Sequence, residues 1–128
     1  MNPSKETNPG GEACERPVFD ASVLNAMFGD EPALIANVLQ TFVSSTRANL
    51  TALFQALAIQ DMPAIAGLAH KIAGASRMSG ALALGDCARS LEQAAKRGDT
   101  ASLPQGAADL ETQWALALAT IAQQVLLS

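Results

Sequence analysis

The sequence is poor in aromatic side chains, cysteine and histidine. Of its 128 residues 4% are aromatic, none is tyrosine, two are cysteine and one is histidine. Cys14 and Cys87 are too few for the framework of a disulfide-stapled protein, so we expect free thiols in a reducing compartment. A metal site is disfavoured as well, because one histidine and two distant cysteines lack the spacing of a ligand set.

Long hydrophobic runs are also absent from the sequence. No apolar stretch approaches the ~18 residues of a membrane-spanning helix. The first residues, MNPSKE, contain no hydrophobic signal region. We therefore expect a cytoplasmic protein, or the cytoplasmic piece of a larger one, without membrane contact.

Positive charge is scarce overall but concentrated in one segment. The chain has 8 basic and 12 acidic residues and a net charge of −4, which is the opposite of a nucleic-acid-binding protein. Residues 71–97 hold five basic and two acidic side chains, for a net charge of +3. We expect this basic segment to face an acidic partner and the association to weaken with added salt.

Helix-forming residues dominate what is present. Alanine and leucine supply 26 and 16 residues, and both favour helices over strands. Residues 1–17 are polar and contain glycine and proline, so we expect a disordered tail or linker there. The helical domain is expected over residues 18–128.

Capping residues, glycine and proline set the expected helix boundaries. Helices are predicted over 21–28 with Asp20 as cap, and to residue 58 with Asp30 as cap and Glu31 and Pro32 in the first turn. Further helices are predicted from Asp61 to 77 or 78, over 81–97, and from 99 or 102 to the C-terminus. Long helices joined by short connections pack antiparallel. The predicted fold is all-α: an up-and-down antiparallel four-helix bundle with an additional short N-terminal helix.

The lone histidine, His70, lies about 140° around its predicted helix from the core residue Ile65, at 100° per residue. The residues next to it on the helix surface are Ala66, Gly67, Ala73 and Gly74. A glycine inside a helix costs about 1 kcal/mol relative to alanine. Either these small residues clear space for another molecule at His70, or they allow a neighbouring helix to pack closely and His70 is an ordinary surface residue.

Residues 69–80 (AHKIAGASRMSG), with Leu91-Glu92 and 97–99 (RGD), resemble the histidine-containing phosphotransfer (HPt) domain of multistep two-component relays. The shared pattern is His-x-Ile-x-Gly-x-Ser with a second glycine ten residues after the histidine, and the resemblance covers roughly 20–127. It implies that His70 accepts a phosphoryl group from a receiver-domain aspartyl phosphate and passes it to another receiver aspartate. Such a phosphohistidine carrier has no ATP-dependent kinase activity.

The resemblance also implies roles for residues around His70. Gly74 would give steric clearance, and Glu92 would hold Nδ1–H so that Nε2 attacks; alternatively Glu92 is a solvated partner of Lys96. Family members often carry a basic residue three positions after the histidine, where this chain has Ala73. Arg77 is our preferred substitute for phosphate contact, with Lys71 and Lys96 as further candidates. Alternatively, these charges only aid solubility.

Receiver docking is expected on the short first helix and its surroundings. The residues that the resemblance points to are Val23, Leu24, Met27, Phe28, Gln40 and Ser44, with Gly67 and Ala73 beside the histidine. Alternatively, the apolar members simply cap the core. The implied partners are receivers of a hybrid sensor histidine kinase or of response regulators. The Mg²⁺ belongs to the receiver, so this chain is expected to bind no cofactor. A monomer is expected because each of the four long helices shows a single apolar face, which the bundle itself can bury. The competing function is a helical adaptor that docks a partner without carrying phosphate.

Overall fold

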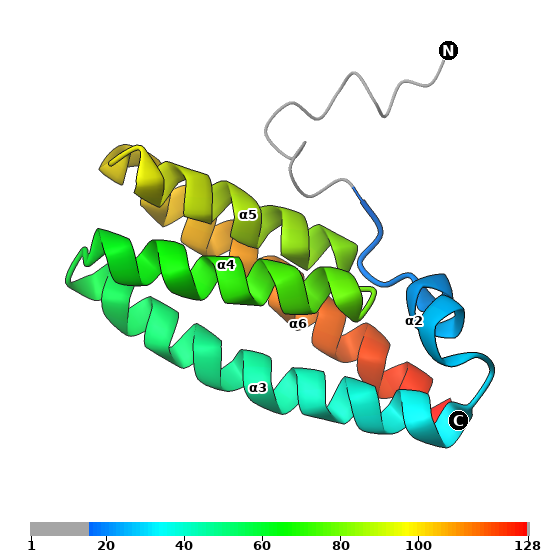
Figure 1. The fold of residues 1–128 in the computed structure, drawn as a ribbon. Helices are drawn as coiled ribbons and strands as arrows, with labels where there is room; N and C mark the ends of the chain where they lie inside the picture. The colour runs from blue at the N-terminus through cyan, green and yellow to red at the C-terminus, as the bar shows by residue number, and fades with distance from the viewer. Residues whose placement is uncertain (1–15, 128) are drawn as a thin grey trace, which may run out of the picture.

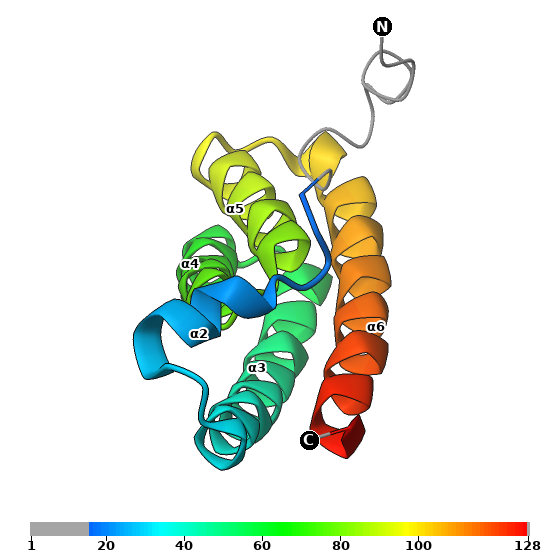
Figure 2. The ribbon, with the colours of Figure 1, turned by 90° about the vertical axis from the view of Figure 1, so that its right-hand side faces the viewer.

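A computed structural model describes residues 16–127 of the chain and the side chains of residues 16–124. The α-helices in this part are α2 (Ala21–Phe28), α3 (Pro32–Ala58), α4 (Met62–Met78), α5 (Leu82–Lys96) and α6 (Leu103–Leu127). Helices α3 to α6 form an up-and-down bundle, and α2 crosses the end where α3 begins and α4 ends (Figures 1 and 2). The predicted fold class is confirmed.

Side-chain caps start the helices largely where the sequence predicts. The carboxylate of Asp20 accepts a hydrogen bond from Ser22 N at 3.0 Å, and that of Asp61 accepts one from Ala64 N at 3.3 Å. The prediction is wrong at the start of α3, where Glu31 rather than Asp30 is the N-cap residue. Proline sits at the first helical position because its missing N–H has no partner there in any case.

The last helix is preceded by a short 3-10 turn, η2 (Thr100–Ser102). Asp99 accepts hydrogen bonds from the backbone N and the hydroxyl of Ser102, at 3.3 and 2.6 Å. Of the two predicted starting points, Asp99 is the cap of the 3-10 turn, and Ser102 is the residue directly before α6.

The turn between α4 and α5 requires a glycine. Gly80 has a φ of +90°, and a Cβ there would lie 2.5 Å from the carbonyl oxygen of Asp20. The backbone N of Asp20 donates to the Gly80 carbonyl at 2.8 Å. The chain that leads into α2 is thus tied to the α4–α5 turn, and any side chain at position 80 would push it away.

Helices α4 and α5 pack closely along the hairpin. A Cβ on Gly85 would lie 3.0 Å from Arg77 Cγ and 3.3 Å from the Ala73 carbonyl oxygen. The buried residues of α5 include the small side chains Ala83, Ala88, Ala94 and Ala95. Because little side-chain volume separates the two helices, residues far apart in the sequence face each other across the hairpin.

The core continues into α3 and α6. Phe42 on α3 meets the half-buried Trp114 on α6 edge to face, with ring centroids 6.2 Å apart. Gly106 of α6 lies against Leu91 of α5. The fully buried large side chains include Leu24, Leu39, Leu53, Ile65, Ile72, Leu84, Leu91 and Leu110. Met78, by contrast, is 63% exposed at the end of α4.

The segment before α2 lies against the start of α5. Arg16 makes two hydrogen bonds of 2.7 Å to the Asp86 carboxylate, and Ala83 N donates to the Pro17 carbonyl at 3.0 Å. Residues 1–15 of the predicted tail lie outside the described residues. The expectation of free thiols is wrong for Cys87, which is buried and takes part in a disulfide, and Cys14 lies outside the described part.

Candidate functional site

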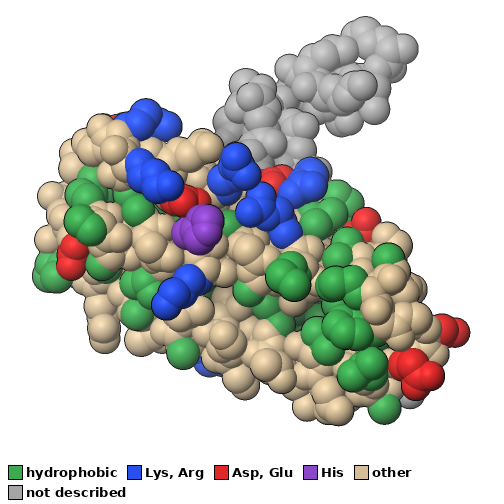
Figure 3. Space-filling model, viewed as in Figure 1, with side chains coloured by type: hydrophobic (Ala, Val, Ile, Leu, Met, Phe, Trp, Pro, Cys, Tyr) green, Lys and Arg blue, Asp and Glu red, His purple; other side chains and the backbone are tan. Residues whose placement is uncertain are grey.

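His70 stands on the outer face of α4. Its side chain is 71% exposed, and Figure 3 shows the imidazole on the surface among lysine and arginine side chains. A Cβ placed on Gly67 or Gly74 would meet nothing within 4 Å. The alternative of close helix packing at these glycines is therefore excluded, and both border open space beside the imidazole.

Glu92 on α5 reaches across the hairpin to the histidine. Its carboxylate oxygen Oε2 lies 3.0 Å from His70 Nδ1 and 3.0 Å from Lys96 Nζ. Glu92 therefore makes the contacts of both interpretations, with His70 and with Lys96, but it is buried rather than solvated. An ionised carboxylate only accepts hydrogen bonds, so Nδ1 is the nitrogen that donates to it, and in the neutral imidazole the lone pair is then on Nε2.

Glu92 is ionised at neutral pH although it is only 8% exposed. Burial alone would raise the pKa of its carboxyl group. The hydrogen bonds from Lys96 and His70 and the charges of these two groups outweigh burial and hold the pKa below its ordinary value of 4.5. A fixed negative charge therefore lies against the Nδ1 side of the imidazole.

This arrangement suits nucleophilic attack by Nε2 on an electrophilic phosphorus. The attacking nitrogen gives up its lone pair while Nδ1 keeps its hydrogen, so the ring gains positive charge. The Glu92 carboxylate stabilises that charge and fixes the ring orientation. The exposed side of the ring carries the reactive nitrogen toward an incoming partner.

A hollow of about 260 Å³ lies next to His70 between α4 and α5. The residues that line it are His70, Arg77, Arg89, Glu92, Gln93 and Lys96. Arg77, Glu92 and Lys96 were predicted from the sequence, whereas Arg89 and Gln93 were not. Helical spacing could have identified both residues, because positions 89, 92, 93 and 96 share one face of α5. Lys71 is exposed but does not line the hollow.

Two comparisons with known proteins bear on the family of this chain. The model of the Hpt domain family matches residues 37–124. The chain belongs to the Hpt domain family. It is also similar to the crystal structure of histidine-containing phosphotransfer protein B (HptB) from Pseudomonas aeruginosa PAO1, with a TM-score of 0.77 and 28% identity over 89% of this chain and 99% of that chain. A search of curated proteins finds no match.

The family assigns this Hpt domain a role as a histidine phosphotransfer module in phosphorelays. The resemblance implied this role, and the comparisons confirm it. In the described part, no helix is long and apolar enough to cross a membrane. The same residues contain no group of three or more His, Cys, Asp or Glu side chains that could hold a metal ion.

Two residues expected in contact with a partner are buried in this Hpt domain. Ala73 is 1% exposed, since it lies on the side of α4 that faces Gly85 of α5. Leu24 is 0% exposed and belongs to the core cluster. Neither side chain reaches the surface, so both expectations are corrected: Ala73 and Leu24 pack the interior.

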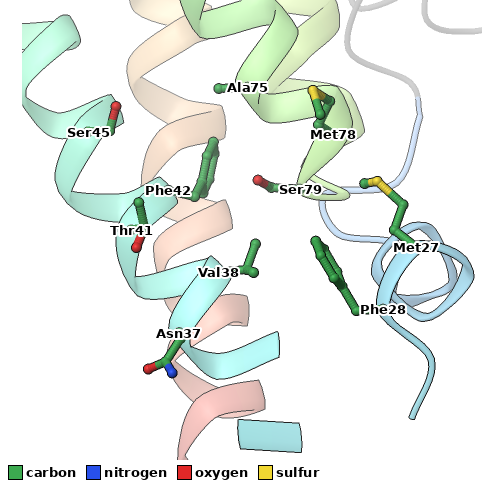
Figure 4. Close-up of a pocket in the computed structure, with 10 residues that line it drawn as sticks. All are labelled: Met27, Phe28, Asn37, Val38, Thr41, Phe42, Ser45, Ala75, Met78 and Ser79. Carbon is green, nitrogen blue, oxygen red and sulfur yellow. The ribbon is translucent and has the colours of Figure 1, made fainter. Parts of the chain in front are cut away.

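An apolar groove lies between α2, α3 and α4, where the sequence predicted a docking surface. Its volume is about 420 Å³. Figure 4 shows the residues that line it: Met27, Phe28, Asn37, Val38, Thr41, Phe42, Ser45, Ala75, Met78 and Ser79. Met27 and Phe28 were predicted, whereas Met78 was not. Val23 is half-buried and does not line the groove.

Gln40 and Ser44 were expected beside this surface, and the structure places them elsewhere. They line a separate hollow between α3 and α6, together with Leu118. The side of α3 that borders the groove carries Thr41 and Ser45 instead. The physical reason is that a residue one position further along a helix points about 100° away.

Proposed function

We propose that this Hpt domain accepts a phosphoryl group on Nε2 of His70 from a receiver aspartyl phosphate and passes it to an aspartate of a second receiver. The observation that carries the proposal is the exposed imidazole of His70, whose Nδ1 contacts the carboxylate of the buried Glu92. Open space at Gly67 and Gly74 leaves room for the receiver beside Nε2. The protein acts as a phosphohistidine carrier rather than as an ATP-dependent kinase.

The proposed transfer balances without a further reactant. The Nε2 lone pair forms the N–P bond as the P–O bond to the donor aspartate breaks, and that electron pair stays on the aspartate carboxylate. The proton remains on Nδ1, where Glu92 accepts it in a hydrogen bond. The ring of the product is cationic, so it is a good leaving group when the second aspartate attacks phosphorus. In-line positioning and charge stabilisation carry most of such a reaction.

We place the Mg²⁺ of the reaction in the acidic pocket of the receiver. The contribution of this chain is the nucleophile, its fixed orientation and the basic surface around it. The basic segment 71–97 complements an acidic receiver pocket, so added salt should weaken the association.

The groove between α2, α3 and α4 is the proposed docking surface for the receiver. Met78 lies eight residues after His70 on the same helix, about 12 Å along its axis at 1.5 Å per residue. Figure 3 shows hydrophobic side chains and the imidazole on one face of the molecule. Met78 and Met27 are 63% and 46% exposed, which leaves apolar area for a partner to cover. A receiver on the groove can therefore reach His70.

The proposal includes a cytoplasmic monomer. The apolar stripes of α3 to α6 are buried within one chain, so the fold needs no second subunit. A carrier must share a compartment with its donors, and relay phosphate originates from ATP in the cytoplasm. The free-thiol argument for this location no longer applies, because Cys87 is in a disulfide. Light scattering and cell fractionation test these two statements.

The experiment uses purified receivers from the source organism, loaded with labelled phosphate at the aspartate. We expect acid-labile, base-stable label to move to the wild-type protein and not to the His70→Gln variant. Label in His70→Gln, or none in the wild type with any receiver, would contradict the proposal. Receivers that bind the wild type but never transfer phosphate would instead establish the adaptor function.

A further inference from the structure

We propose that Arg77 and Arg89 clamp the phosphoryl group once it is on His70. This inference rests on the proposed phosphotransfer at His70 and names the residues that hold the transferred group. Ala73, at the position where family members often carry a basic residue, is buried and uncharged, so this position gives the phosphoryl oxygens no cation. The two arginines come from different helices and face the same space as the imidazole.

Placement is the first argument for the clamp. Arg77 lies two turns after His70 on α4, and Arg89 lies on α5 one turn before Glu92. Both line the hollow of about 260 Å³ that also contains the imidazole, which has room for a tetrahedral phosphoryl group. A Cβ on Gly85 would come within 3.0 Å of Arg77 Cγ. The absence of a side chain at Gly85 therefore lets the Arg77 stem lie across α5.

Charge is the second argument. Three cations and one carboxylate line the hollow, and Lys96 is engaged by Glu92 at 3.0 Å. Within the described part of the chain, Arg77 and Arg89 make no ion pair with a carboxylate. A phosphoryl group brings about two negative charges. Two unpaired guanidinium groups match this charge, and their planar forks suit phosphoryl oxygens.

The same arginines could serve a different purpose, which is to contact the acidic pocket of the receiver. Phosphoramidate separates the two roles because it loads histidine without a receiver. The P–N bond of phosphoramidate breaks as the P–Nε2 bond to His70 forms, and the amine leaves as ammonia. A clamp lowers the barrier of this reaction and protects the product from hydrolysis, whereas a docking residue affects neither.

The test compares Arg77→Gln, Arg89→Gln and the double variant with a matched control, Arg47→Gln. Arg47 is exposed on α3 and does not line the hollow. Loading by phosphoramidate and subsequent loss are followed by ³¹P NMR, with circular dichroism as a folding check. We expect each single variant to load roughly tenfold more slowly and to lose phosphate faster, the double variant to be worse, and the control to match wild type. The Lys variants at 77 and 89 should recover part of the rate.

Wild-type loading and lifetime in the folded double variant would overturn the clamp while leaving phosphotransfer at His70 intact. A defect seen only with receivers would also overturn it and would make the arginines docking residues. If phosphoramidate loads His70 with the expected arginine dependence but no receiver transfers to it, the clamp stands and the proposed relay function fails.

Discussion

Nδ1 of His70 lies 3.0 Å from Oε2 of Glu92, across two helices that the chain connects by a turn at Gly80. The same carboxylate oxygen lies 3.0 Å from Lys96 Nζ. An exposed imidazole, the proposed nucleophile, thereby contacts a buried anion, and Lys96 one turn further along α5 helps to keep that anion ionised. The site consists of these two facing helices rather than of a loop, so its geometry is set by helix packing.

Replacing Glu92 should slow phosphotransfer without removing the phosphorylation site. Glu92→Ala leaves the ring free to rotate and its positive charge uncompensated, so we expect a rate loss of roughly 10- to 100-fold. Glu92→Gln keeps a hydrogen-bond acceptor and should lose less. Single-turnover transfer from a loaded receiver measures both, with Glu111→Gln on the exposed face of α6 as control. Equal rates in wild type and Glu92→Ala would remove Glu92 from the mechanism.

The lowered pKa of Glu92 predicts a pH dependence of stability. A carboxyl group whose pKa is lower in the folded than in the unfolded state adds stability above the unfolded value, near 4.5. That stability is lost as the pH falls through the lower folded value. Urea unfolding at pH 7 and pH 3 should therefore show a smaller acid destabilisation in Glu92→Gln than in wild type. An identical pH profile in the two proteins would contradict the ion pairs described here.

Two substitutions at Gly74 should show that this glycine lowers helix stability and gives the receiver access to His70. A Cβ at this position meets nothing, and its φ is not in the left-handed region, so Gly74→Ala should raise the free energy of unfolding by about 0.5–1 kcal/mol. Gly74→Leu should also fold but slow transfer from receivers by roughly tenfold or more, because a side chain beside His70 displaces the partner. Gly85→Ala is the contrast, since its Cβ meets α4 and should destabilise the fold. Undiminished transfer in Gly74→Leu would show that clearance is not needed.

If a receiver docks on the groove, removing the exposed apolar side chains of the groove should weaken receiver binding without unfolding the protein. Met27→Ser and Met78→Ser remove exposed apolar side chains, so each should raise the Kd for a receiver about tenfold, given about 1.5–3 kcal/mol for a fully buried side chain. Ile59→Ser is the control, because Ile59 is 75% exposed and follows the far end of α3. Calorimetric titration with a receiver measures all three. A larger effect at Ile59 than at Met78 would place docking elsewhere.

Sequence patterns predicted the parts of this protein that depend on one helix or one turn. The helix over 21–28, the cap at Asp61 and the exposed face of His70 all follow from local periodicity and capping. The Glu92 contact was implied by the resemblance, and it depends on the hairpin of α4 and α5 that turns at Gly80.

What the sequence did not predict depends on which neighbour covers each helix face. Met78 was not predicted as part of the docking surface, yet it is exposed because α4 ends there beside the α2 crossing. Ala73 appeared free beside His70, but α5 covers it. Gln40 borders α6 instead of the groove. Periodicity defines the faces of a helix, whereas these outcomes depend on the rotation and closeness of adjacent helices.

The most direct test of the account is the identity of the phosphorylated nitrogen. Protein with ¹⁵N-labelled histidine is loaded from a receiver aspartyl phosphate, and long-range ¹H–¹⁵N NMR of the single imidazole assigns both ring nitrogens. We predict phosphorus on Nε2 of His70 and a proton on Nδ1. Phosphorus on Nδ1, or an unmodified imidazole in protein that carries the phosphate elsewhere, would contradict the central claim.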